Sequence, residues 1–299
     1  MLNRRILRIK VFKVLYAYAE NQGMTLKEAQ ALFNRSCEAT RDLWLFMLGL
    51  IPALRDEASL RIEAARGKFH PTEEERNPNM KFVQNRLSAL FDNDPDYTKL
   101  VAKKKFSWDQ YDAFLRKLYE TVRSRQYFID YMNSPAYGIA ADAALFVKIF
   151  EQELEDSEEI QAILEDMSIL WVDDLSYALI QCCKTITELG AGKIWELPEL
   201  VSEENSAFAS GVLRTGFVNF ADYRSKIAAK TGNWDDGRLF NVDVALIASG
   251  LAEMRTFPDI PRGVVINEYV EISKYYSTPK SRAFVNGMLD EIIKNDFNN

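Results

Sequence analysis

Residues 277–290 read STPKSRAFVNGMLD, and this stretch begins the last helix of the chain. Thr278 is a favoured N-cap residue and Pro279 suits the first helical position, so a helix over residues 279–295 is predicted. Gly287 inside that helix costs roughly 1 kcal/mol relative to alanine. We expect another backbone, such as that of the first helix, to approach closely at this glycine.

The first turn of this last helix has the wrong charge for an ordinary helix start. Lys280 and Arg282 stand where acidic side chains are usually preferred. The turn also offers free backbone N–H groups, which are a natural seat for a phosphate. Phe284, one turn further on, suits either stacking on an unpaired base or packing in a core, and its spacing leaves both readings open.

The first helix, predicted over residues 3–20, is basic at its N-terminal end. Residues 1–19 contain no acid, and their basic residues are Arg4, Arg5, Arg8, Lys10 and Lys13. Arginines at a helix N-terminus oppose the macrodipole, and an anionic ligand would reverse that penalty. A merely solvated basic end, or a mitochondrial-type presequence, is the alternative interpretation.

The apolar pattern of the first helix predicts that it is held from two sides. Leu7, Val11, Val14 and Tyr18 form one seam, and Ile9, Phe12 and Tyr16 form a second. We expect Lys10 and Lys13 on the remaining, solvated side.

Helical periodicity extends over most of the remaining chain, and strand-like alternation is scarce. Thr25 and Glu28 form a capping box, and residues 70–79 resemble a loop because of their prolines. The sequence therefore predicts an all-α fold with essentially no β-sheet. The further predicted helices cover residues 25–66, 80–92, 108–133, 136–153, 157–189, 202–230, 235–255 and 261–275.

Composition places the chain among folded proteins of a reducing compartment. The formal net charge is −7, so any nucleic-acid site must be a local patch. The three cysteines form no C-x-x-C pair, and no stretch resembles a signal peptide or is long enough to span a membrane. We therefore expect a cytoplasmic protein without membrane association.

Enzymatic chemistry is not expected. The single histidine, His70, excludes a metal site built on a histidine pair, and the chain has no glycine-rich phosphate loop. Asp173 and Asp174 are interpreted as surface residues. The sequence predicts no catalytic residues, no metal and no cofactor.

Several stretches, in the same order, resemble the bacterial transcription antitermination factor NusB family. The first is Arg4-Arg5-x-x-Arg8 followed by Leu15-Tyr16. The stretches of the second half are Phe208–Leu213, Asn233-Trp234 with Arg238, Val242-Asp243 with Glu253, Val265–Glu268 and Phe284–Asp290. The last block, at this distance from Ile266-Asn267-Glu268, is the most specific.

The resemblance implies a NusB-like helical bundle that binds boxA-type single-stranded RNA of ribosomal RNA transcripts. It also implies a small-subunit ribosomal protein (NusE) as partner and an indirect effect on the RNA polymerase elongation complex. By motif position, Tyr16 and Asp243 would face the ribosomal protein. The RNA-binding residues by motif position are Arg4, Arg5, Arg8, Lys280, Arg282, Phe284 and Asn286.

The chain is longer than the family pattern, which suggests a large helical insertion. We expect residues 1–22 to form the first helix of the bundle, residues 23–200 the insertion and residues 201–299 the second half of the bundle. Within the insertion, residues 103–108 (KKKFSW) suit a second basic and aromatic RNA contact, although a solvated turn is the simpler reading. An adaptor that keeps the fold but has weak or no RNA affinity is the alternative function.

Overall fold

The computed structural model describes residues 1–231 and 239–296. Within these residues every regular element is a helix, which confirms the predicted all-α class. The chain divides into two compact units. Unit 1 comprises Met1–Glu38 and Glu199–Asn299, and unit 2 comprises Ala39–Pro198.

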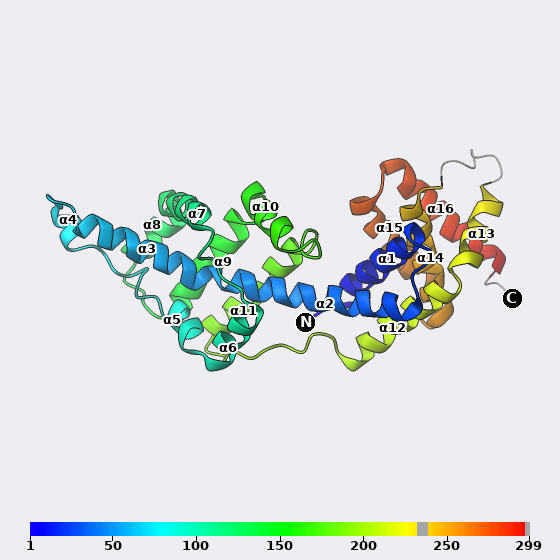
Figure 1. Ribbon diagram of the computed structural model, residues 1–299, viewed down its shortest axis with the longest axis horizontal. Coiled ribbons are helices and arrows are strands. Elements are labelled where there is room, and N and C mark those ends of the chain that lie inside the picture. The colour runs from blue at the N-terminus through cyan, green and yellow to red at the C-terminus, as the bar shows by residue number, and fades with distance from the viewer. Residues whose placement is uncertain (232–238, 297–299) are drawn as a thin grey trace. The chain divides into compact units, whose positions relative to one another are not determined.

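Unit 1 is a bundle arranged around one central helix (Figure 1). Its elements are α1 (Arg4–Glu20), the first part of α2 (Leu26–Leu48), α12 (Glu203–Val218), α13 (Phe220–Lys230), α14 (Asn241–Thr256), α15 (Arg262–Tyr276) and α16 (Pro279–Asp296). The central helix is α14, which packs against α1, α12, α13, α15 and α16. Its residues from Asp243 to Met254 are all buried, as expected for a helix that is apolar on every side.

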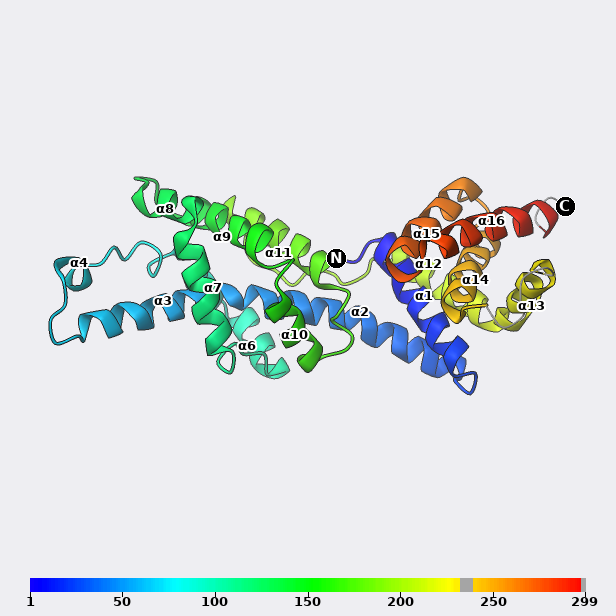
Figure 2. The same cartoon turned by 90° about the horizontal axis from the view of Figure 1, so that it is seen from above.

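Unit 2 is a separate helical assembly (Figure 2). Besides the rest of α2, it contains α3 (Leu50–Arg66), α4 (Glu73–Arg76), α5 (Arg86–Asn93), α6 (Pro95–Lys104), α7 (Asp112–Ser124), α8 (Gln126–Asn133), α9 (Ile139–Glu153), α10 (Glu158–Met167) and α11 (Leu175–Gly190). Helices α9 and α11 pack closely together. The core is built on large side chains such as Trp44, Phe46, Phe82, Phe146 and Phe150, all almost completely buried.

The single helix predicted over residues 25–66 is wrong, because the structure has two helices there. Helix α2 ends at Leu48 and α3 begins at Leu50. Pro52 has no backbone N–H to donate to the carbonyl of Leu48, so the ladder is interrupted next to Gly49.

Two short helices were not predicted. Helix α4 lies inside the expected loop and begins with a capping box between Thr72 and Glu75. Helix α6 begins where Asp94 caps the chain and Pro95 occupies the first helical position. At the start of both helices, the sequence contains the capping residues that indicate a helix N-terminus.

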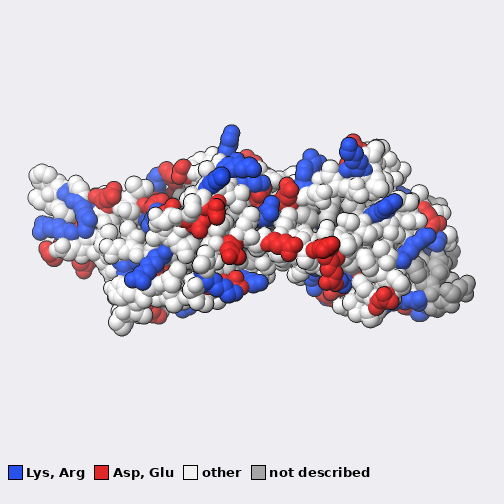
Figure 3. All heavy atoms as spheres, turned by 90° about the horizontal axis from the view of Figure 1, so that it is seen from below, with Lys and Arg blue, Asp and Glu red and all other residues white. Residues whose placement is uncertain are grey.

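The acidity of the chain belongs to unit 2. Unit 2 contains 19 Lys and Arg against 27 Asp and Glu, whereas unit 1 contains 18 against 17. On the face shown in Figure 3, basic and acidic side chains alternate rather than form one large field. No helix among the described residues is both long and apolar enough to cross a membrane.

Candidate nucleic-acid interface

Helix α1 begins at an asparagine cap and is anchored by apolar side chains. The Oδ1 atom of Asn3 accepts a hydrogen bond of 3.1 Å from the backbone N–H of Ile6. Leu7, Val11 and Leu15 are buried where α12 and α14 pack along the helix. Val14 of the first predicted seam is also buried, and of the second predicted seam Phe12 is buried whereas Tyr16 is 39% exposed.

Lys10 is not on a solvated side of α1, contrary to the expectation from the sequence. Its side chain is 2% exposed and has polar partners. Because α12 and α14 both pack along a helix of 17 residues, little of its length remains open to water. The polar surface of α1 is accordingly limited to its first turn, to the half-buried Lys13 and to the exposed Tyr16 and Glu20.

Arg4 is partly exposed but already has partners on α12. Its guanidinium forms an ion pair of 2.5 Å with Glu204 and a hydrogen bond of 3.4 Å with Oδ1 of Asn205. The same group lies 5.0 Å above the ring of Phe208. Exposed ion pairs of this kind contribute at most about 1 kcal/mol, so a phosphate can compete for Arg4.

Arg8 is buried inside the bundle. It forms two hydrogen bonds with Glu253, of 2.9 and 2.6 Å, and its second terminal nitrogen lies 3.4 Å from Glu268. Glu253 also accepts a hydrogen bond of 3.0 Å from the hydroxyl of Tyr269. Burial alone would lower the pKa of Arg8, but the hydrogen bond and charge of Glu253 outweigh it and raise that pKa. Arg8 as a residue is 6% exposed, and a guanidinium held by two carboxylates is poorly placed for the phosphate contact expected from the sequence.

Arg5 and Arg282 converge on one carboxylate of α15. Glu271 has a lowered pKa, caused first by its hydrogen bond from Lys274 and to a smaller degree by the charges of Arg5 and Arg282. Arg5 is exposed and Arg282 is half-buried, and the two residues come from α1 and α16. The tertiary structure thus brings the two basic helix starts to the same place on unit 1.

The start of α16 matches its prediction in geometry. The Oγ1 atom of Thr278 accepts a hydrogen bond of 3.2 Å from the backbone N–H of Ser281. In the helix that follows, Lys280 and Asn286 are exposed and Phe284 is half-buried. The Nε atom of Arg282 is buried without a hydrogen-bond partner among the described residues.

Gly287 does not touch another helix. A Cβ atom added at this position would meet nothing within 4 Å, and the residue is exposed. The expected close approach of the first helix is therefore wrong. The reason is that α16 packs on α13, α14 and α15 through its other face, which includes Val285, Leu289 and Ile292.

The two residues expected to face a protein partner lie in different environments. Tyr16 is 39% exposed, and its ring lies 6.5 Å from that of Phe12, which in turn contacts Tyr276. Asp243 is only 3% exposed and accepts a hydrogen bond of 2.6 Å from Oγ of Ser277. Asp243 therefore fixes the residue that precedes the α16 cap, and only Tyr16 is open to a partner.

The residues around Arg8 form a buried polar cluster to which the sequence assigned no role. Glu253 lies in the mostly apolar, fully buried stretch of α14 from Asp243 to Met254, and it is 0% exposed. A charge in such a helix requires a buried partner, and this signal could have identified Arg8 as that partner. Glu271 and Lys274 gave no comparable signal, because α15 has polar residues on several sides.

The basic and aromatic segment of residues 103–108 is a structural element of unit 2. The Nε1 of Trp108 donates a hydrogen bond of 2.9 Å to the carbonyl of Phe46, and the two rings stack at 4.2 Å. Trp108 is 4% exposed, so it is not available to a base. Asp174 is likewise buried rather than on the surface, and it accepts a hydrogen bond of 2.5 Å from Thr40.

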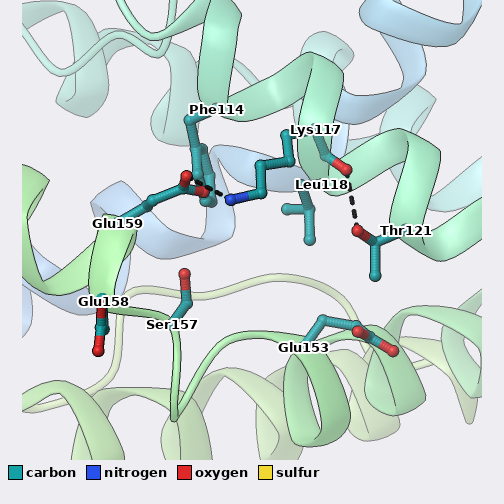
Figure 4. Close-up of a pocket in the computed structure, with 8 residues that line it drawn as sticks. All are labelled: Phe114, Lys117, Leu118, Thr121, Glu153, Ser157, Glu158 and Glu159. Atoms are coloured by element: carbon teal, nitrogen blue, oxygen red, sulfur yellow. Dashed lines mark hydrogen bonds and ion pairs between the residues drawn. The ribbon is translucent and has the colours of Figure 1, made fainter.

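A small pocket between α7 and the start of α10 has its main carboxylates already engaged (Figure 4). Glu159 accepts a hydrogen bond of 2.6 Å from Lys117 across the pocket. Glu153 is held by Arg125 at 2.7 Å and by the hydroxyl of Tyr127 at 3.0 Å. This arrangement ties helices together and gives no pair of carboxylates poised for acid–base chemistry.

Comparison with known proteins gives one consistent family. A model of the NusB family matches residues 187–294. The transcription antitermination protein NusB of Geobacter sulfurreducens is 33% identical over 112 residues, which are 35% of this chain and 81% of that protein. The NusB protein of Thermodesulfovibrio yellowstonii is 37% identical over 108 residues, 35% of this chain and 70% of that protein. That of Dictyoglomus turgidum is 37% identical over 84 residues, 28% of this chain and 58% of that protein. No solved structure matches the chain.

Fold and site together define an all-α protein in which two basic helix starts share one surface. The chain belongs to the NusB family, a family of non-enzymatic transcription antitermination proteins. The matched residues 187–294 cover most of the second part of unit 1. Apart from residues 187–198, unit 2 lies outside the family match.

Proposed function

We propose that unit 1 binds boxA-type single-stranded RNA of ribosomal RNA transcripts and acts in transcription antitermination together with a small-subunit ribosomal protein (NusE). Through that complex it would act on the RNA polymerase elongation complex. The observation that carries the proposal is that α1 contacts the end of α15 next to the start of α16: the ring of Phe12 lies 5.3 Å from that of Tyr276, and the charges of Arg5 and Arg282 both act on Glu271. Two basic helix starts at one place supply the local positive patch that an acidic protein needs for RNA.

The phosphate contacts are assigned to the cations that are open to solvent. Arg5 and Lys280 are exposed, Arg282 is half-buried, and Arg4 exchanges its surface pair with Glu204 for a phosphate. Four such contacts on a single strand predict a slope of log affinity against log salt of about −3. Affinity should then fall on the order of fiftyfold between 50 and 200 mM salt.

The remaining residues of the site are assigned by their exposure. Phe284 offers the part of its ring that is open for stacking on a base, and Asn286 offers an exposed amide for a base edge. Tyr16 is assigned to the ribosomal protein. Arg8 and Asp243 are assigned positioning roles, because both are buried and hydrogen-bonded. Arg8 holds α1 through Glu253, and Asp243 holds the start of α16 through Ser277.

The test is a titration of the full chain with labelled boxA-like RNA, with and without the ribosomal protein. The double variant Arg5→Glu with Lys280→Glu reverses two exposed charges of the site. The matched control is Arg35→Glu with Arg214→Glu, two exposed arginines of unit 1 outside the site. The proposal expects salt-sensitive binding that the first variant abolishes and the control retains.

An adaptor with weak RNA affinity is the second candidate function. The observation that favours it is that Arg4 and Arg8, two of the expected phosphate contacts, already have carboxylate partners. Absence of RNA binding under both conditions, with the ribosomal protein still bound by the full chain, would select the adaptor and refute the first proposal.

A further inference from the structure

Unit 2 has a groove that the family match does not account for. The groove has a volume of about 710 Å³ and is lined by residues of α3, α4, α7 and α8. Arg61 of α3 pairs with Glu120 of α7, and Lys68 beyond the end of α3 pairs with Glu75 of α4, so α7 lies at one end of the groove and α4 at the other. We name it the α3–α8 groove.

The floor of the α3–α8 groove is apolar. Ala58 and Ile62 line it on α3, and Phe128, Ile129 and Met132 line it on α8. Ala58 and Phe128 are buried, whereas Ile129 is 41% exposed. Small residues on α3 opposite larger ones on α8 leave a trough that the protein does not fill with its own side chains.

The α7 end of the groove has a cation, Arg123, without a counter-ion among the residues that the structure describes. The guanidinium groups of Arg61 and Arg123 lie 5.5 and 5.7 Å from the ring centre of Tyr119. Arg61 is neutralised by Glu57 and Glu120, both of which form ion pairs with it. Arg123 is exposed and forms no ion pair with any described residue.

The α4 end of the groove has the opposite charge. Lys68 forms an ion pair with Glu75 and is thereby neutralised. Glu74, which also lines the groove, is exposed and has no basic partner within the part of the chain that the structure describes. The apolar trough therefore runs from an unpaired arginine to an unpaired glutamate.

We propose that the α3–α8 groove binds an amphipathic helical segment of a partner protein, with an acidic residue at the Arg123 end and a basic residue at the Glu74 end. Helices ordinarily carry acids in the first turn and bases in the last, so the segment runs with its N-terminus toward α7. Between Arg61 and Lys68 the groove extends about 10 Å, which accommodates roughly two helical turns. Apolar side chains at i, i+3, i+4 and i+7 enter the trough.

A protein segment fits this groove better than RNA does. Unit 2 has 19 basic residues against 27 acidic ones, which gives a field that repels a polyanion. The guanidinium groups of Arg61 and Arg123 already lie 5.5 and 5.7 Å from the centre of the Tyr119 ring, so a base that stacks there has to compete with them. The apolar floor instead suits aliphatic side chains.

The experiment uses the full chain and a displayed peptide library. Each peptide has fixed acids in the first turn, fixed lysines in the last turn and randomised apolar residues at the four trough positions; a second library exchanges the acids and lysines. Selected peptides are then measured by fluorescence polarisation. We expect enrichment from the first library and at least about threefold weaker binding of the charge-exchanged peptides.

Two variants decide whether the peptides occupy the groove. Ile129→Arg should abolish binding, and Arg123→Glu should reverse the preference between the two libraries. Arg116→Glu, an exposed arginine of α7 outside the groove, is the matched control and should leave binding unchanged. The proposal is overturned if neither library yields binders, or if neither Ile129→Arg nor Arg123→Glu changes the measured binding. It is also overturned if RNA or a second copy of this chain, detected by size exclusion, takes the groove instead.

Discussion

Replacing Arg8 by methionine leaves a buried carboxylate without its cation. In the native chain Arg8 and Glu253 form a bidentate pair at 2.9 and 2.6 Å, and their side chains are 7% and 0% exposed. Removing one partner of a buried pair costs about 3–5 kcal/mol, because the remaining charge is desolvated and unpaired. For a unit of this size that loss lowers Tm by roughly 10 °C.

Three further variants separate the buried pair from surface effects. Arg4→Met removes an exposed ion pair with Glu204 and should cost less than about 1 kcal/mol. Arg8→Met combined with Glu253→Gln should be more stable than Arg8→Met alone, by about 1–3 kcal/mol, since the uncompensated charge is gone. Arg8→Lys should lie between the native chain and Arg8→Met, because an ammonium cannot form the two parallel hydrogen bonds.

The assay is urea unfolding, combined with hydrogen exchange of the α1 and α14 amides to assign the transition to unit 1. The expected result is faster exchange in α1 of Arg8→Met than in α1 of Arg4→Met. Equal stability of Arg8→Met and Arg4→Met would refute the anchoring role. Loss of RNA binding by Arg8→Met at unchanged stability would instead make Arg8 a direct phosphate contact.

Three other predictions concern packing, the RNA site and a thiol. Gly216→Ala should destabilise unit 1 by about 1–3 kcal/mol, because the new Cβ would lie 2.6 Å from the buried side chain of Leu15. Gly287→Ala, whose Cβ would meet nothing within 4 Å, should stabilise unit 1 by about 0.5–1 kcal/mol. Thermal unfolding of the two variants measures both effects. Glu271→Gln should strengthen RNA binding in a polarisation titration, because it removes a negative charge that acts on Arg5 and Arg282; unchanged or weaker binding would contradict this role. Burial, followed by the nearby charge of Glu151, raises the pKa of Cys183 to about 11. At pH 8 roughly one molecule in a thousand then has the thiolate, so reaction of Cys183 with a thiol reagent should be slow until the pH approaches 11. Rapid labelling of native Cys183 at pH 8 would contradict this prediction.

Much of the fold could be read from local signals. The caps at Thr25 and Thr278 are present as predicted, and α1 and α16 begin within a residue of their predicted starts. The missed break at Gly49 and the missed start at Pro95 both had a proline in the sequence. Helix existence is determined within a turn or two of chain, which is why these features were accessible without a structure.

Only part of the candidate site could be predicted from the sequence. The sequence identified two basic helix starts as one site because of the family resemblance, and it treated Arg4, Arg5 and Arg8 as equivalent. The structure separates these arginines: Arg5 is exposed, Arg4 has a surface partner and Arg8 is buried against Glu253. Their spacing within one helix turn could not show which of them faces α14.

The sequence by itself determined the all-α class, the helix caps, the basic starts of the first and last helices and the apolar character of α14. These follow from propensity, periodicity and charge within short segments. Only the tertiary structure decided that Arg8 anchors α1, that Asp243 holds Ser277, and that Arg5 and Arg282 meet beside Glu271. The partners in these contacts are far apart in the chain, and what brings them together is the burial of α14 by its neighbours, a property of the whole bundle rather than of any one helix.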